Sequence, residues 1–325
     1  MFSYRSILKQ AWKISWDHKY LWFFGLFASL TVAGGSIEYR SIAQTFGQGV
    51  VSSSYQGLNN LLAIGELCQK IWLGLISLFN QNIIVIINAL TILLLALTII
   101  AVFVWFAITS QAALVDSVKK IISPKKKTNI LSIREGLSSG NKHFWSVLGL
   151  NILIKLLISF AFFIVSLPLL FMAISDNSAF TLAYTVLFVI FVPVALSLSL
   201  IVKYAISARV LENRTIIESM EKACRLFTKN WLISLELALL LFIISFLTSA
   251  ALLLCIAIIF FPLLLFSFFF SMTWLSYILI FLCLAAVIIF GSILTTFQIT
   301  SWTDLYLHLD KDNGVSKLER IFHKK

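Results

Sequence analysis

Two charged residues lie inside long apolar runs of this sequence, and their chemistry is the first question that it raises. Lys155 stands ten residues after Trp145, and Glu236 stands five residues after Trp231. A charge deep in a bilayer costs about 2.5–3.5 kcal/mol on insertion scales, so such residues are functional candidates by default. Three interpretations stay open for Lys155. Its long stem reaches back to headgroups or a water-filled crevice, it pairs with Glu236, or it belongs to a transport or proton path.

Histidines and cysteines are the other side chains that commonly carry chemistry, and their spacing predicts no metal or catalytic site. They are His18, His143, His308 and His323, with Cys68, Cys224, Cys255 and Cys283. They form no HExxH or CxxC motif, and neither a GxxxxGKS phosphate loop nor a GxSxG nucleophile elbow occurs in the sequence. We therefore expect no metal, no cofactor and no enzymatic activity.

The composition places these residues in a membrane protein. Of the 325 residues, 60% are hydrophobic and 12% are charged, whereas soluble domains have about 45–50% apolar and 25% charged residues. Several runs exceed the roughly 20 apolar residues that cross a bilayer core as a helix. A transmembrane β-barrel would instead alternate apolar and polar residues in short segments. The sequence therefore predicts an all-α, polytopic helical membrane protein.

Six transmembrane helices are predicted from these runs. They cover residues 20–33, 83–108, 146–174, 180–201, 231–261 and 274–300. The first run is short, and we expect it to extend backward to about Trp12. Pro168, Pro193 and Pro262 fall within or just after spans, where neighbouring helices satisfy the freed carbonyl groups. The alternative for the first run is a cleaved signal peptide, since it follows a basic start and precedes small residues.

The distribution of positive charge predicts the orientation. Most of the 25 Lys and Arg residues fall in segments 1–19, 117–143 and 202–230 and in the C-terminal tail. With six spans, all four segments lie on one side of the membrane, which the positive-inside rule makes the cytoplasmic side. We therefore expect a protein of the cytoplasmic membrane with both termini inside. The net charge of +11 then reflects topology and predicts no nucleic-acid partner.

The densest basic cluster suggests a partner in the bilayer itself. It reads KKIISPKKK and contains Lys119, Lys120, Lys125, Lys126 and Lys127. Each Lys near an anionic leaflet adds about 1 kcal/mol of attraction. We expect these side chains to contact anionic lipid headgroups, and the alternative is that they only set the topology. The sequence identifies no protein partner and no oligomeric state.

Internal repetition organises the spans into pairs. The segment WSVLGLNILIKLLISF (145–160) aligns without a gap with WLISLELALLLFIISF (231–246). Ser132 with Glu135 and Thr215 with Glu218 have the spacing of a capping box, which starts a helix ahead of each segment. The ends of the second spans also match, since ITSQAALV (108–115) resembles ITSWTDLY (299–306) and, more loosely, AISARVLE (205–212).

The repeating element is an amphipathic cytoplasmic helix followed by two spans, and it occurs three times. In the first copy, Tyr4, Leu8, Ala11, Trp12 and Ser15 share one helical face. The chain is expected to form a single integral membrane domain, 1–325, with repeats 1–118, 128–211 and 213–306 and a tail, 307–325. Segment 57–79 is also amphipathic and is expected in the outer interface, with a re-entrant segment as the alternative.

Three segments resemble a family of prokaryotic membrane proteins. They are SILKQAWKISWDHKYLWFFG, ISARVLENRTIIESMEKACRLFTKNW and ITSWTDLY, and they resemble glycerophosphoryl diester phosphodiesterase membrane domain proteins and neighbouring uncharacterised families. The resemblance implies a multi-span helical topology. Because 25 residues follow Thr300 and a phosphodiesterase barrel needs about 250, we expect no catalytic barrel. We expect a structural, lipid-interacting or envelope-related role, and a small-solute or lipid transporter is the alternative.

Overall fold

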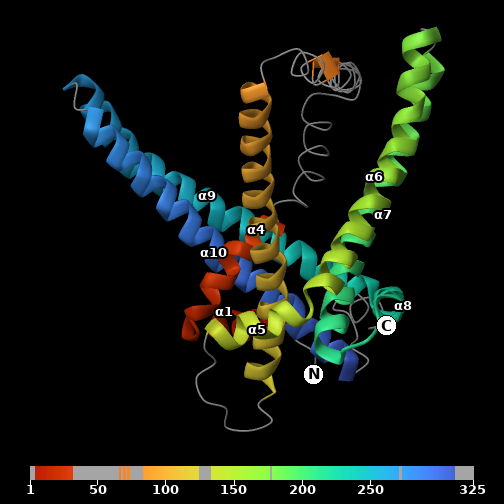
Figure 1. Ribbon diagram of the computed structural model, residues 1–325. Coiled ribbons are helices and arrows are strands. Elements are labelled where there is room, and N and C mark those ends of the chain that lie inside the picture. Colours follow the sequence, from red (N-terminus) through yellow and green to blue (C-terminus); the bar gives the residue numbers. More distant parts are fainter. Residues whose placement is uncertain are drawn as a thin grey trace. The chain divides into compact units, whose positions relative to one another are not determined.

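The computed structural model describes residues 4–31, 66, 69–70, 72–73, 83–123, 133–175, 178–270 and 273–311. These residues are helical apart from short turns, and none of them lies in a strand (Figure 1). The all-α prediction is therefore confirmed for the part of the chain that is described. The expected interfacial segment 57–79 and the tail beyond Lys311 fall almost wholly outside these residues.

Five of the described helices are long and apolar enough to cross a membrane, as a multi-pass membrane protein requires. They are α4 (Ile83–Ile122), α6 (Phe144–Ser175), α7 (Ser178–Glu212), α9 (Trp231–Phe269) and α10 (Thr273–Lys311). They have 32 to 40 residues, which is about 48–60 Å at 1.5 Å per residue. A bilayer core is about 30 Å thick. Each helix is therefore longer than a crossing requires.

The first predicted span differs from this pattern. Helix α1 (Tyr4–Asp17) ends before a separate apolar helix, Tyr20–Thr31, begins. The expected backward extension to Trp12 is therefore wrong. The break falls at His18 and Lys19, where the Leu21 amide donates to the His18 carbonyl at 2.9 Å. The second helix is about 18 Å long, so a sixth span stays a prediction.

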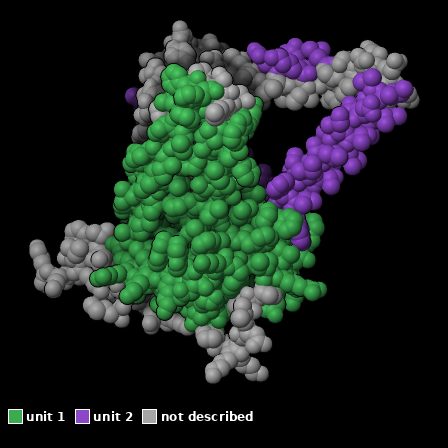
Figure 2. Space-filling view, turned by 90° about the vertical axis from the view of Figure 1, so that its left-hand side faces the viewer, with its two compact units in different colours: residues 1–32, 106–150, 200–325 green, residues 33–105, 151–199 purple. Residues whose placement is uncertain are grey.

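The chain divides into two compact units (Figure 2). Unit 1 contains residues 1–32, 106–150 and 200–325, and unit 2 contains residues 33–105 and 151–199. In unit 2, the Phe162 and Phe191 rings of α6 and α7 pack with centroids 5.7 Å apart. Most large apolar side chains described in unit 2 are exposed; Leu94, Phe160 and Val189 are examples. Such exposure is ordinary for a helix surface that faces lipid.

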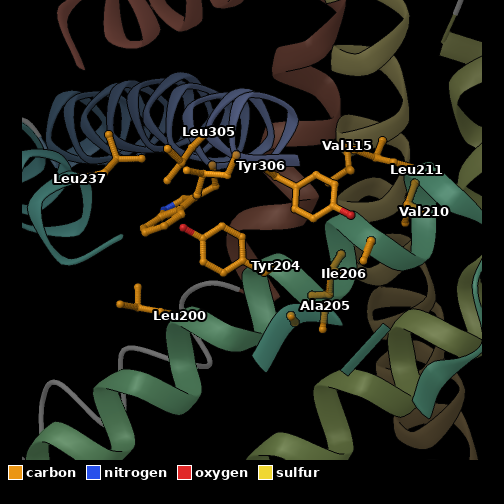
Figure 3. Packing of buried hydrophobic residues seen from close by; sticks show 14 of the residues in the cluster. Val115, Leu200, Tyr204, Ala205, Ile206, Val210, Leu211, Leu237, Leu305 and Tyr306 are labelled. Atoms are coloured by element: carbon orange, nitrogen blue, oxygen red, sulfur yellow. The ribbon is translucent and has the colours of Figure 1, made fainter. Parts of the chain in front are cut away.

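Seven helices of unit 1 share a core. The ends of α4, α6, α7, α9 and α10 and the short helices α1 and α8 (Ile216–Lys229) contribute buried apolar residues to one cluster (Figure 3). Tyr204 and Tyr306 are among its largest fully buried side chains. Helix α1 packs along α10, and α8 packs against α9. The ends of the apolar helices therefore pack together in one bundle within unit 1.

Glycines allow the closest helix contacts in unit 1. At Gly25, the Tyr20–Thr31 helix approaches α10 so closely that a Cβ atom would meet the Thr296 hydroxyl and the Ser292 carbonyl. The Ser292 hydroxyl donates to the Trp22 carbonyl across the same contact. Small residues that let backbones approach are typical of helix interfaces in membranes. Gly140 of α5 (Ile133–Lys142) is likewise packed against the Thr109 carbonyl of α4.

We expect Gly25→Leu to destabilise the protein by about 1–3 kcal/mol, the usual cost of overpacking a tight interior. Its side chain would have to displace the α10 backbone at Ser292. Gly291→Leu is the matched control on α10, because a Cβ atom there meets nothing within 4 Å. Thermal unfolding of the two purified variants in detergent, followed by circular dichroism, measures the effect. Equal midpoints for the two variants would contradict the close contact.

Candidate functional site

The two predicted intramembrane charges lie in different units. Lys155 is exposed on the part of α6 that belongs to unit 2, and Glu236 is half-buried on α9 in unit 1. Their pairing stays a prediction. The length of α6 bears on the depth of Lys155, since about 30 Å of helix separates it from Ser175. That length alone spans a bilayer core, so α6 can cross with Lys155 at the membrane boundary.

The first two lysines of the predicted lipid-binding cluster have protein partners. The Lys119 ammonium donates to the carbonyl of Leu211 near the end of α7. Basic side chains commonly satisfy the last carbonyls of a helix in this way. Lys120 lies 2.7 Å from Asp116, which also accepts a 2.6 Å hydrogen bond from Ser139. Lys125, Lys126 and Lys127 lie outside the described residues, and lipid contact by this cluster stays a prediction.

The turn between α7 and α8 is held by backbone and side-chain contacts. Asn213 has φ 55°, in the left-handed region that asparagine tolerates at the end of a helix. The predicted capping box at Thr215 and Glu218 is confirmed: the Glu218 amide donates to the Thr215 hydroxyl at 3.3 Å, and the Thr215 amide donates to the Glu218 carboxylate at 3.0 Å. Ser132, in the other predicted box, lies outside the described residues.

Glu212, the last residue of α7, is the centre of an ionic network. Its carboxylate accepts hydrogen bonds from the Tyr306 hydroxyl of α10, from Arg214 Nε at 2.5 Å and from Lys222 Nζ of α8 at 2.5 Å. Lys222 Nζ also lies 2.5 Å from Asp310 of α10. We call these five residues the Glu212 cluster. It joins the ends of α7 and α10 to α8.

The Glu212 cluster is electrically balanced, because two cations face two carboxylates. The Lys222 side chain is only 12% exposed, so its charge depends on the two carboxylates that it contacts. Removing one partner of a buried ion pair leaves the other charge uncompensated, which typically costs 3–5 kcal/mol. Because the contacts satisfy these charges within the protein, the cluster is suited to joining helices.

A second cation, the half-buried Lys203 of α7, packs against an aromatic ring of α10. Lys203 Nζ lies 4.5 Å from the centroid of the Trp302 ring, where the negative face of the indole attracts an ammonium group. The neighbouring Tyr204 hydroxyl lies 2.6 Å from the Ser234 hydroxyl. The predicted fourth span ends at residue 201, but α7 continues through Lys203 to Glu212. The spacing of residues in the sequence does not predict the contact of Lys203 with the Trp302 ring.

Asp304 of α10 is a buried acid that was not among the residues predicted from the sequence. Its side chain is fully buried, and neither carboxylate oxygen makes a hydrogen bond within the described part of the chain. His308 Nδ1 lies 3.2 Å from Oδ1, an ion pair only when the imidazole is protonated. The adjacent Thr300 and Ser301 hydroxyls donate to carbonyls of α10 and not to Asp304. A buried acid without hydrogen-bond partners among the described residues calls for an explanation, which makes Asp304 a functional candidate.

Comparison with known protein families, with curated protein sequences and with solved structures finds no match for this chain. The described residues also contain no group of three or more His, Cys, Asp and Glu side chains arranged to hold a metal ion. The functional interpretation therefore depends on the geometry of the chain itself.

We expect Tyr306→Phe to lower stability by about 1.5–3 kcal/mol, the usual value of a hydrogen bond to a charged group. The variant removes one donor from Glu212 and keeps the ring in the core. Tyr277→Phe is the control on the same helix, because Tyr277 is 73% exposed. Thermal unfolding of each variant measures the effect. Combined with Glu212→Gln, Tyr306→Phe should cost less than the sum of the two single changes, and strict additivity would contradict the contact.

A pH dependence is expected from His143, at the turn before α6. Burial lowers the pKa of its imidazole from 6.5, Arg209 and Lys142 lower it further, and Asp116 opposes them. The unfolded chain therefore binds a proton at His143 more readily than the folded protein does. Stability is highest above about pH 6.5 and falls as the pH drops below that value. His143→Gln should unfold at midpoints that change less between pH 7.5 and 5.5 than those of the unmodified protein. An unchanged pH profile would contradict the assignment.

Proposed function

We propose that this protein is a non-enzymatic multi-pass protein of the cytoplasmic membrane with a structural, lipid-interacting or envelope-related role. One observation carries the proposal: α4, α6 and α7 continue beyond the length of a bilayer crossing into unit 1, where their ends share a core with α9 and α10. Within that unit, the Glu212 cluster pairs its charges with one another. An arrangement that is satisfied internally is suited to holding helices in place.

Matched burial supports the proposal of three two-span repeats and hence of six spans. Three similar segments, 108–115, 205–212 and 299–306, each have a serine at the third position and a leucine at the seventh. All six side chains are buried in unit 1. They are Ser110, Ser207 and Ser301, with Leu114, Leu211 and Leu305. Equivalent positions with equivalent burial are expected if one ancestral hairpin was used three times.

The family resemblance also remains a proposal, and unit 1 supports it in one respect. The three segments that carry it contribute α1 with the Tyr20–Thr31 helix, the α7–α8 turn, and the end of α10. All three belong to unit 1, and the last two meet at Glu212 and Tyr306. Residues that are distant in the sequence but share a core have reason to be retained together.

A small-solute or lipid transporter is the second candidate, and Asp304 is the observation that favours it. A fully buried acid with a histidine one turn away is a common element of proton and ion paths. Lys155 does not support transport in the same way. Helix α6 is long enough to cross the bilayer with Lys155 at the membrane boundary, so this charge need not lie inside the membrane.

Cysteine labelling tests the proposed topology. Cys224 is exposed on α8, and Cys68 falls in the connection that six spans place outside. In variants that keep one of these cysteines and replace the others with serine or alanine, we expect a membrane-impermeant maleimide to label Cys68 in intact cells. Cys224 should react only after permeabilisation. Labelling of Cys224 in intact cells would reverse the orientation and remove the basis for cytoplasmic termini.

Charge substitution separates the structural role from transport. If Lys155 and Glu236 pair, Lys155→Gln and Glu236→Gln should each lower the amount of folded protein, and exchanging the two residues should restore it. If Lys155 instead reaches headgroups, each single variant should keep its level and the exchange should add nothing. Flux assays in proteoliposomes decide the remaining case, because normal protein levels with loss of a solute flux would support the transporter.

A further inference from the structure

Helix α1 has two contrasting faces. Tyr4, Ala11 and Ser15 are buried in unit 1, as the predicted apolar face requires, and α1 packs along α10. Trp12, which is predicted to lie on that face, is instead 53% exposed. It belongs to an outer face that also carries a second tryptophan and three cations. The outer face consists of Arg5, Lys9, Trp12, Lys13 and Trp16.

The two tryptophans of this face form an ordered aromatic surface. Trp12 and Trp16 are stacked with ring centroids 5.7 Å apart and an angle of 15° between the ring planes. Trp12 also meets the edge of Phe297, and Trp16 leans on Trp22 of the next helix. Both rings nevertheless remain about half exposed. Aromatic rings of this kind concentrate at membrane–water interfaces, where one side is apolar and the other is wet.

The charges on the same face all have one sign. Arg5, Lys9 and Lys13 are exposed, and none of them forms an ion pair with another described residue, in contrast to Lys120 and Lys222. The acidic residue of α1, Asp17, stands at its last position. A cationic face next to exposed tryptophans complements the anionic surface of a bilayer, where polybasic helices are attracted to phospholipid headgroups.

The position of α1 in the chain favours lipid over a soluble partner. The apolar Tyr20–Thr31 helix begins three residues after α1 ends, and its side chains Phe23 and Leu30 are exposed. The Trp22 indole donates to the Ser15 carbonyl at 2.8 Å, so the two helices are joined side to side at the break. The aromatic surface of α1 is therefore continuous with an exposed apolar helix.

We propose that the outer face of α1 is a binding surface for anionic phospholipid headgroups, with Trp12 and Trp16 at the level of the upper acyl chains and Arg5, Lys9 and Lys13 on the phosphates. This inference rests on the proposed membrane location, but it assigns lipid contact to residues distinct from the basic cluster 119–127. In this arrangement α1 lies at the membrane surface and anchors unit 1 to one leaflet.

Brominated lipids test the proposal in the full-length protein reconstituted in nanodiscs. Bromine quenches tryptophan at short range, so the quenching lost in a Trp12→Phe, Trp16→Phe double variant reports these two rings. The phenylalanines keep the contact with Phe297, and circular dichroism checks the fold. We expect stronger quenching of this pair by 6,7-dibrominated than by 11,12-dibrominated chains, and stronger quenching by brominated phosphatidylglycerol than by brominated phosphatidylcholine at equal mole fraction.

Charge variants make the headgroup part of the proposal independent of the tryptophan variant. Lys9→Gln with Lys13→Gln should reduce the preference of the pair for phosphatidylglycerol by about fivefold for each lysine. Arg134→Gln with Arg225→Gln is the matched control, because both arginines are exposed elsewhere in unit 1. The control should keep the preference. If both double variants lose the preference for phosphatidylglycerol equally, the effect comes from net charge alone and the proposed site is overturned.

Two further outcomes separate this inference from the proposed function. If neither brominated lipid quenches the Trp12 and Trp16 pair while Cys224 labelling gives the expected topology, the α1 surface is overturned and the membrane protein stands. If Cys224 is labelled in intact cells, the proposed topology fails whatever the quenching shows. Quenching of the pair without any lipid preference would contradict the phosphate contacts.

Discussion

The carboxylate of Glu212 is the contact on which the arrangement of unit 1 depends. It receives the Tyr306 hydroxyl, the Arg214 guanidinium and the Lys222 ammonium, from α10, the α7–α8 turn and α8. A carboxylate can accept several hydrogen bonds at once, and all three donors come from different parts of the chain. Because Lys222 is also bound to Asp310, the charges that hold these helix ends cancel locally, and the neighbouring apolar core of Tyr204 and Tyr306 can form around them.

Much of the helical architecture follows from the sequence, but the ends of the helices do not. Continuous apolar runs predict helices, and the capping box at Thr215 marks the start of α8 correctly. Hydropathy shows where an apolar run ends, and a helix is free to continue because its backbone hydrogen bonds are internal. Helix α4 thus continues from the expected end at Ile108 to Ile122, with Ala112 and Val115 buried in the unit 1 core. At the N-terminus the opposite occurs, since His18 and Lys19 interrupt a helix that apolar content alone would have joined.

The candidate site was less predictable, because its members are close only in space. Lys155 and Glu236 stand out in the sequence as isolated charges among apolar residues. Glu212 and Lys222 stand among other polar residues in the sequence, so neither charge is unusual there. Tyr306 is 94 positions from Glu212, the residue that accepts its hydrogen bond. A weak signal did exist, since Glu212 and Tyr306 end two of the echoed segments. The repeat alignment relates such positions by ancestry, but it gives no information on which of them touch.

The close packing and the polar contacts of unit 1 have a physical reason. Lipid chains are as apolar as leucine, so the hydrophobic effect gives helices little drive to associate within a bilayer, and packing and polar contacts must supply it. Unit 2 accordingly exposes much of its apolar surface. In unit 1, close glycine contacts such as that of Gly25, buried aromatic rings and the Glu212 cluster supply this packing and these polar contacts. If the outer face of α1 binds headgroups, the same unit also meets the one surface of the bilayer that offers charge. Polar residues that join helix ends have a clear task in such a protein, because lipid alone gives the helices little reason to associate.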